Sequence, residues 1–106
     1  MENLEVVNIE ILNEEEKAIA NKLFNEYYPR IQRLVKSPLS LKIHFKEYDK
    51  EGKKKKYSIN AEAIFSGGKV ISSDSWSWDF ARAIHKAMKK LETEIEHKFH
   101  KGDFTK

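Results

Sequence analysis

The chain has 106 residues, with 20 Lys and Arg against 17 Asp and Glu, a formal net charge of +3 and no cysteine. This length suits one domain with one core, and the absence of cysteine excludes disulfides, thiolate catalysis and thiolate zinc sites. The mildly basic balance permits a nucleic-acid partner without requiring one. No apolar run is long enough to cross a membrane and the N-terminus has no signal-peptide pattern, so we expect a cytoplasmic protein.

The first third of the chain changes from a strand pattern to a helix pattern. Residues 4–12 are rich in β-branched side chains, which predicts a strand. From Asn13 onward, apolar residues recur at every fourth position, which predicts an amphipathic helix. Asn13 can cap this helix, and Glu16 stands where a capping box places its acid. Pro29 predicts that the helix kinks or ends near Tyr28, before a short continuation.

Three further strands are predicted in the middle of the chain. Residues 39–48 alternate between apolar and polar side chains, and so do residues 56–65, which is typical of half-buried antiparallel strands. The stretches DKEGK and SGGK have the composition of tight turns. Residues 69–73 predict a short last strand, which leaves Trp76 and Trp78 in a polar connection to the next element.

The last segment predicts a helix from about Ser77 to Lys101, with one apolar stripe. Ser77 or Asp79 can cap its start, and Gly102 can end it. The order is therefore β-α-β-β-β-α, with one apolar face on the sheet and one apolar stripe on each helix. This pattern predicts an α+β two-layer sandwich, a four-stranded sheet with both helices on one face.

Basic residues gather on the outer faces of both predicted helices and in the lysine run between the second and third strands. Lys and Arg side chains on an exposed helix face are what contacts to RNA phosphates need. The alternative is a solvated surface or, for the lysine run, an aggregation-resistant end of the sheet. That run either extends the helical surface or stands apart from it. The candidate RNA-binding residues are Lys17, Lys22, Arg30 and Arg33 on the first helix, Arg82, Lys86, Lys89, Lys90, His97, His100 and Lys101 on the last, and Lys53, Lys54, Lys55 and Lys56 in the run.

Catalysis and metal binding find little support in the sequence. There is no nucleophile elbow, and SGGK joins two strands, whereas a phosphate-binding loop joins a strand to a helix. His97 and His100, with Glu96 nearby, lack a third fixed ligand, so surface histidines are the simpler interpretation. We therefore expect no enzyme activity, no cofactor, no metal and no small-molecule substrate.

The tryptophan pair has three interpretations. Trp76 and Trp78 are two residues apart and would share a side in an extended segment. One of them packs over the start of the last helix beside Phe80, or they stack on an unpaired base, or they anchor a partner subunit.

The order of elements and the last helix resemble the ribosome hibernation promoting factor family, also called ribosome-associated inhibitors or sigma-54 modulation proteins. The stretch DFARAIHKAMKKLETEIEHKFHKGD is similar to the family's acid, aromatic, Ala-Ile, Lys-Leu-Glu and closing His-Lys-Gly-acid, carried here by Asp79, Ala83, Ile84, Lys90, Leu91, Glu92, His100, Lys101 and Gly102. The first helix and the strand LSLKIHF align with similar spacing. The sequence departs from the family in its longer, more basic KEGKKKK hairpin, in Pro29, in the SWSW stretch, and in lacking the second domain of long members.

The resemblance implies a single non-enzymatic domain over residues 1–106 that binds the small ribosomal subunit and its ribosomal RNA. Such proteins occupy the channel for mRNA and tRNA and inactivate or protect idle ribosomes, and this chain would either block subunits or dimerise them. By position, Lys86, Lys89, Lys90 and Lys101 would lie on the RNA-facing helix, with Lys17 as their partner on the first. Two alternatives remain open: a shape-specific double-stranded RNA module on the same fold, and a homodimeric interaction protein without RNA. We expect no membrane partner.

Overall fold

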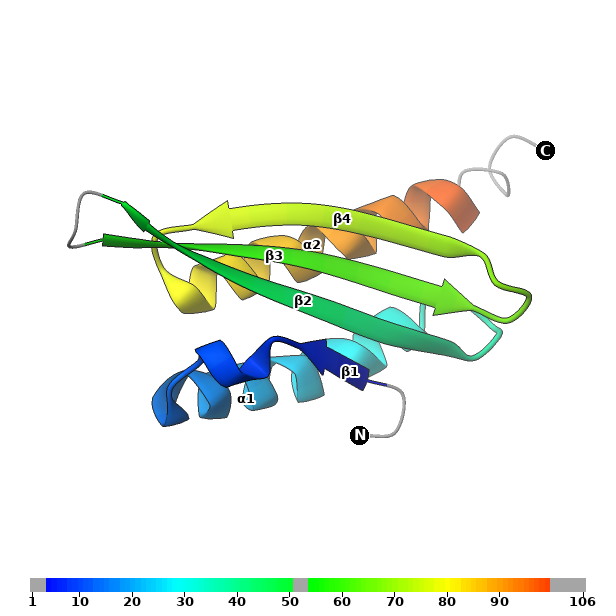
Figure 1. The fold of residues 1–106 in the computed structure, drawn as a ribbon. Coiled ribbons are helices and arrows are strands. Elements are labelled where there is room, and N and C mark those ends of the chain that lie inside the picture. The colour runs from blue at the N-terminus through cyan, green and yellow to red at the C-terminus, as the bar shows by residue number, and fades with distance from the viewer. Residues whose placement is uncertain (1–3, 51–53, 100–106) are drawn as a thin grey trace.

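The computed structural model describes residues 4–50 and 54–99, and its elements follow the predicted order (Figure 1). They are β1 (Leu4–Val7), the short 3-10 helix η1 (Ile9–Ile11), α1 (Glu14–Gln32), β2 (Leu39–Lys50), β3 (Lys54–Phe65), β4 (Val70–Ser77) and α2 (Phe80–Phe99). The strands form one sheet in the order β1-β2-β3-β4, parallel between β1 and β2 and antiparallel elsewhere. Both helices lie on the same face of the sheet, which confirms the predicted two-layer α+β sandwich (Figure 1).

The core lies between this sheet face and the two helices. Because strand side chains alternate, Ile43 of β2 and Ile59 of β3 point toward the helices, and both are fully buried. Phe24 of α1 and Phe80 of α2 approach Phe45 of β2, with ring centroids 6.1 and 5.8 Å apart. The alternate strand positions face solvent on the opposite side of the sheet, where neither helix covers them.

α1 begins with the predicted capping box and continues past Pro29. The Asn13 side chain accepts from the Glu16 amide at 2.8 Å, and the Glu16 carboxylate accepts from the Asn13 amide at 3.0 Å. Pro29 lies inside the helix, which continues to Gln32, so of the two predicted outcomes the helix does not end near Tyr28. Pro29 removes one helical N–H, but the carbonyl that loses its partner belongs to Asn25, an exposed residue, so solvent can hydrate it. The Tyr28 hydroxyl then donates to the Leu39 carbonyl at 2.9 Å and holds the helix end against β2.

The first strand is shorter than the predicted segment 4–12. β1 ends at Val7 because Asn8 takes a left-handed conformation, with φ of 67°, and η1 follows directly. Asparagine is one of the few residues that tolerate this conformation. Its side-chain amide donates to the Phe45 carbonyl at 3.2 Å, so a contact with β2 stabilises the bend.

The last strand is longer than the predicted segment 69–73. β4 pairs with β3 from Val70, opposite Ile64, to Ser77, opposite Tyr57, so Trp76 lies in a strand and the predicted polar connection is wrong at that position. Aspartate is depleted in strands, and this stretch has few β-branched residues, but the ladder with β3 outweighs the low strand propensity. Asp79 then caps α2, since its carboxylate accepts from the Arg82 amide at 2.8 Å.

Of the two predicted tight turns, SGGK is confirmed, whereas residues 51–53 of DKEGK lie outside the described residues. Gly67 and Gly68 have φ of 91° and 89°, and the Gly68 amide donates to the Phe65 carbonyl at 3.0 Å. Only glycine adopts such angles at little cost, so the SGGK stretch forms a hairpin turn as predicted. The predicted end of the last helix near Lys101 and Gly102 lies outside the described residues.

Candidate nucleic-acid interface

The first half of α2 carries positive charge without any acid. Its sequence from Phe80 to Lys90 contains four Lys or Arg residues, all with exposed side chains, and no Asp or Glu. None of the four forms a salt bridge with a carboxylate in the part of the chain that the structure describes. We call this set the basic half of α2, and it consists of Arg82, Lys86, Lys89 and Lys90.

Two of these lysines also cover an edge of the sheet. The Lys86 ammonium donates to the Trp76 carbonyl at 2.8 Å, and the Lys90 ammonium donates to the Asp74 carbonyl at 2.9 Å. β4 is an edge strand, and exposed edge carbonyls invite pairing with another chain unless something occupies them. Each ammonium has three N–H donors, so these bonds leave capacity for a phosphate oxygen. The sequence placed both lysines away from the core correctly but did not reveal their contact with β4.

The tryptophans lie at the same corner of the molecule. Trp76 and Trp78 are 44% and 45% exposed, and their rings meet edge to face, with centroids 5.7 Å apart and planes at 88°. Neither indole is therefore buried over the start of α2. The Tyr57 ring contacts Phe80 at this helix start, edge to face, with centroids 5.2 Å apart.

Lysines from two elements meet at Trp76. The Lys56 ammonium lies 4.5 Å from the centroid of the Trp76 ring, and the Lys86 ammonium lies 5.6 Å from it. Lys56 is the last residue of the lysine run, so at this residue the run joins the surface of α2. Lys53 lies outside the described residues, and the side chains of Lys54 and Lys55 are not described.

On α1 the candidate cations are partly neutralised. Lys17 pairs with Glu14 at 3.5 Å, and Arg30 pairs with Glu92 of α2 at 3.1 Å. Arg30 also lies 4.8 Å above the Tyr27 ring. The remaining α1 candidates, which are exposed, are Lys22 and Arg33.

The seam between the helices contains one pair that sequence reasoning missed. The Tyr27 hydroxyl and His85 Nδ1 are 2.7 Å apart, and burial raises the pKa of the Tyr27 hydroxyl above its ordinary value of about 10. The only sequence signal was the position of His85 beside the apolar stripe of α2. This contact helps to fix α2 against α1 and so orients the basic half.

The histidine candidates remain apart from these contacts. His97 is exposed on the second half of α2, after the three acids Glu92, Glu94 and Glu96, while His100 and Lys101 lie outside the described residues. Among the described residues, no three His, Asp or Glu side chains gather as a metal site would require.

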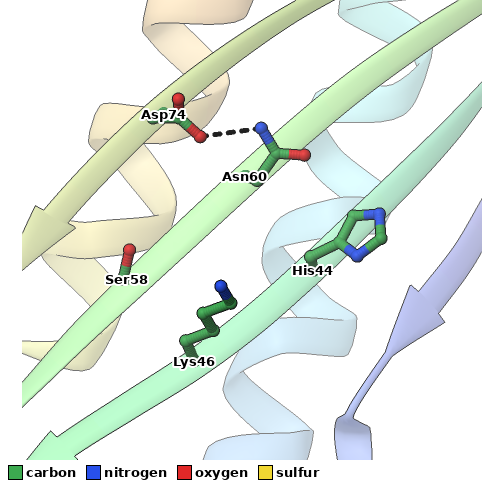
Figure 2. Close-up of a pocket in the computed structure, with 5 residues that line it drawn as sticks. All are labelled: His44, Lys46, Ser58, Asn60 and Asp74. Carbon is green, nitrogen blue, oxygen red and sulfur yellow. Dashed lines mark hydrogen bonds between the residues drawn. The ribbon is translucent and has the colours of Figure 1, made fainter.

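A shallow hollow lies on the other side of the sheet, away from the helices (Figure 2). The Asn60 side-chain amide donates to the Asp74 carboxylate at 2.7 Å, and Figure 2 shows Ser58, His44 and Lys46 along the neighbouring strand positions. The His44 ring lies 4.0 Å from the Glu62 carboxylate, and no hydrogen bond joins it to the Ser58 hydroxyl in the described structure. Asp74, which lines the hollow, is also the residue whose carbonyl accepts from Lys90 of the basic half of α2.

No helix in the described part of the chain is long and apolar enough to span a membrane.

Comparison with known proteins identifies the fold. No protein-family model matches the sequence, and no curated protein does. Among solved structures, the crystal structure of the Thermus thermophilus Protein Y N-terminal domain matches with a TM-score of 0.59. The two chains are 21% identical, and the match covers 89% of this chain and 92% of that one. At this identity the similarity shows a shared fold over nearly the full length of both domains.

Proposed function

We propose that this chain is a ribosome-associated factor that binds the small ribosomal subunit through its ribosomal RNA and inactivates or protects idle ribosomes. Two observations support this proposal besides the surface chemistry. The sequence resembles the ribosome hibernation promoting factors, and the chain shares its fold with Protein Y, a member of the same family. Residues 1–106 would act as one cytoplasmic domain without a cofactor.

The observation that carries the proposal is the basic half of α2. Four exposed cations lie within nine residues of one helix, and no described carboxylate pairs with them. Arg82 lies in the first turn, at the positive end of the helix dipole, where a cation costs about 0.3–1 kcal/mol of helix stability. The Asp79 cap is the one acid at the start of this helix, and no acid follows it before Leu91, so this charge distribution favours an anionic partner.

Binding of this kind is mainly electrostatic. Each Lys or Arg that contacts a phosphate releases condensed counterions, so four contacts predict a slope of roughly −3 to −4 in log affinity against log salt concentration. The contacts would position the protein on ribosomal RNA without reading its sequence.

Co-sedimentation with small ribosomal subunits in sucrose gradients tests the proposal. We expect the chain to migrate with small subunits at low salt and to dissociate as salt rises. Binding to free duplex RNA but not to subunits would instead support a shape-specific RNA module on this fold. A stable dimer without any RNA binding would contradict both.

Lys89 is the best single position for a matched pair of variants. Unlike its neighbours Lys86 and Lys90, it makes no side-chain hydrogen bond to β4 among the described contacts, so its substitution leaves the sheet edge intact. We expect Lys89→Glu to weaken subunit binding about tenfold and to reduce the salt slope by about one. Lys69→Glu makes the same charge change in the SGGK turn, at the opposite end of β4 from Trp76, and serves as the control. Equal affinities for the two variants would place the interface elsewhere.

A further inference from the structure

The tryptophans form a second feature at the end of the basic half of α2. We call the group Lys56, Trp76, Trp78 and Lys86 the indole cluster. Both indoles are nearly half exposed, and two ammonium groups lie within 5.6 Å of the Trp76 ring. The cluster draws on β3, β4, the connection after β4, and α2, so the tertiary fold brings it together.

The core does not account for this cluster. Trp76 occupies the solvent-facing side of β4, where the neighbouring outward positions hold Ser72 and Asp74. The residues of β4 that face the helices are Ile71, Ser73, Ser75 and Ser77, and none of these positions involves an indole. Large exposed aromatic surface beside cations is typical of sites that bind the bases and phosphates of single-stranded nucleic acid.

We infer that the indole cluster binds one unpaired nucleotide of RNA, with the base stacked on an indole face and its phosphate held by Lys56 and Lys86. This inference rests on the proposed function and adds the chemical nature of one contact. It assigns the basic half of α2 to the RNA backbone and the indole cluster to a base that has left its helix.

The ring geometry limits the site to a single base. The two indole planes stand at 88°, and the edge of one ring points to the face of the other. Successive stacked bases are nearly parallel, so perpendicular rings cannot each accept one of them. A single base on the exposed face of one indole fits this arrangement, and stacking of this kind tolerates any base.

The relative strengths of the two contacts favour a base over the ammonium groups as the partner of the Trp76 ring. An exposed cation–π contact contributes only about twofold to fivefold to an equilibrium. Stacking of a base on an aromatic side chain contributes about fivefold to more than a hundredfold in affinity. When a base takes the Trp76 face, the two ammonium groups can move from the ring to the phosphate and keep an electrostatic partner.

Tryptophan fluorescence gives a direct measurement, because Trp76 and Trp78 are the only tryptophans in the chain. The probes are a uridine hexanucleotide and an abasic hexamer with the same phosphates. We expect the hexanucleotide to quench the fluorescence and to bind at least tenfold more tightly than the abasic hexamer. Equal affinity for the two probes, or binding without a change in fluorescence, would overturn the inference.

Variants separate stacking from apolar contact. Trp76→Leu keeps an apolar side chain without an aromatic face, and we expect it to lose the preference for the hexanucleotide while its affinity for the abasic hexamer stays the same. Val70→Ala is the matched control, since Val70 is 50% exposed on the same face of the same strand. Trp78→Leu provides a second test with Trp76 as the reporter. A dimer that dissociates on Trp76→Leu, without a difference between the two probes, would show that the indoles contact protein instead.

The outcomes distinguish this inference from the proposed function. Absence of a base preference with small-subunit binding retained would refute the role of the indole cluster and leave the role of the basic half of α2 intact. Base preference without any small-subunit binding would contradict the ribosomal role and leave a single-stranded RNA site.

Discussion

The two helices lie side by side on the same sheet but distribute their charges in opposite ways. α1 has three acids in its first turn, Glu14, Glu15 and Glu16, where the helix dipole favours them, and it has a complete capping box. α2 has no acid in its first turn, and all its charged residues before Leu91 are basic. The charges of α1 therefore support its own stability, whereas those of α2 suit a partner outside the molecule.

The contacts of each helix agree with this difference. Lys17 and Arg30, two of the candidate cations of α1, pair with acids of the same domain. The cations of α2 make hydrogen bonds to the carbonyls of β4 or none that the structure describes. A hydrogen bond to a neutral carbonyl does not neutralise the charge of an ammonium group. The positive potential at this corner of the molecule can therefore still attract a phosphate.

Paired charge reversals give the largest expected effect. We expect Arg82→Glu with Lys89→Glu on α2 to weaken small-subunit binding roughly a hundredfold, because both cations lie in the unneutralised half. Lys22→Glu with Arg33→Glu on α1 makes the same charge change, and we expect it to weaken binding less than about tenfold. Co-sedimentation over a salt series measures both. A larger loss of affinity in the α1 variant than in the α2 variant would show that α1 makes the main RNA contact.

A substitution at Tyr57 tests whether Glu16, one of the acids of α1, stabilises the fold. Its hydroxyl donates to Glu16 at 2.8 Å and so ties the start of α1 to β3. We expect Tyr57→Phe to lower the free energy of unfolding by about 1.5 kcal/mol, since the bond has a charged acceptor. Chemical denaturation measures this, and RNA affinity should stay unchanged.

Tyr57 also predicts a loss of stability at high pH. Burial and, secondarily, the bond to Glu16 raise the pKa of its hydroxyl well above the ordinary value of about 10. The folded state then holds this proton more tightly than the unfolded state, so the contribution is complete below pH 10 and falls as the pH rises above it. Tyr57→Phe should make this alkaline decline shallower, with Tyr27, whose pKa is also raised, providing the remainder. An identical alkaline profile in the variant would contradict the assignment.

Asn13→Ala removes the cap of α1 and should have a smaller effect. We expect the free energy of unfolding to fall by about 1 kcal/mol, because the Glu16 amide loses its acceptor. For a domain of this size, that corresponds to a decrease of about 4–8 °C in melting temperature, which calorimetry can measure. The variant should still bind small subunits, because the basic half of α2 is unchanged.

Glu92→Gln should have the smallest effect. It removes the ion pair with half-exposed Arg30, which predicts a loss of about 0.5 kcal/mol in stability. It also frees one cation on α1, so RNA affinity should rise slightly if α1 takes part in binding. Affinity and unfolding measured on one preparation separate the two effects, and a fall in affinity would contradict a role for free Arg30.

The local patterns of the sequence were sufficient to predict the architecture. Period-two and period-four spacing predicted the order of elements and the single apolar sheet face, because side-chain direction depends only on local backbone geometry. The capping box of Asn13 and Glu16 and the SGGK turn were predicted for the same reason. The exposed cations of α2 were also predicted, since helical spacing alone places them opposite the apolar stripe.

Contacts between distant segments decided what the sequence left open. The register of β3 against β4 extended the last strand and put Trp76 on the outer face, despite a run of serines and an aspartate, a residue type that is depleted in strands. That same placement brought Trp76 beside Lys56 and Lys86, which are 20 and 10 residues away along the chain. The sequence by itself determined which residues are basic, aromatic or buried. Which of these residues contact one another was decided by the register of β4 against β3 and by the packing of α2 along β4. No local pattern of the sequence contains that information.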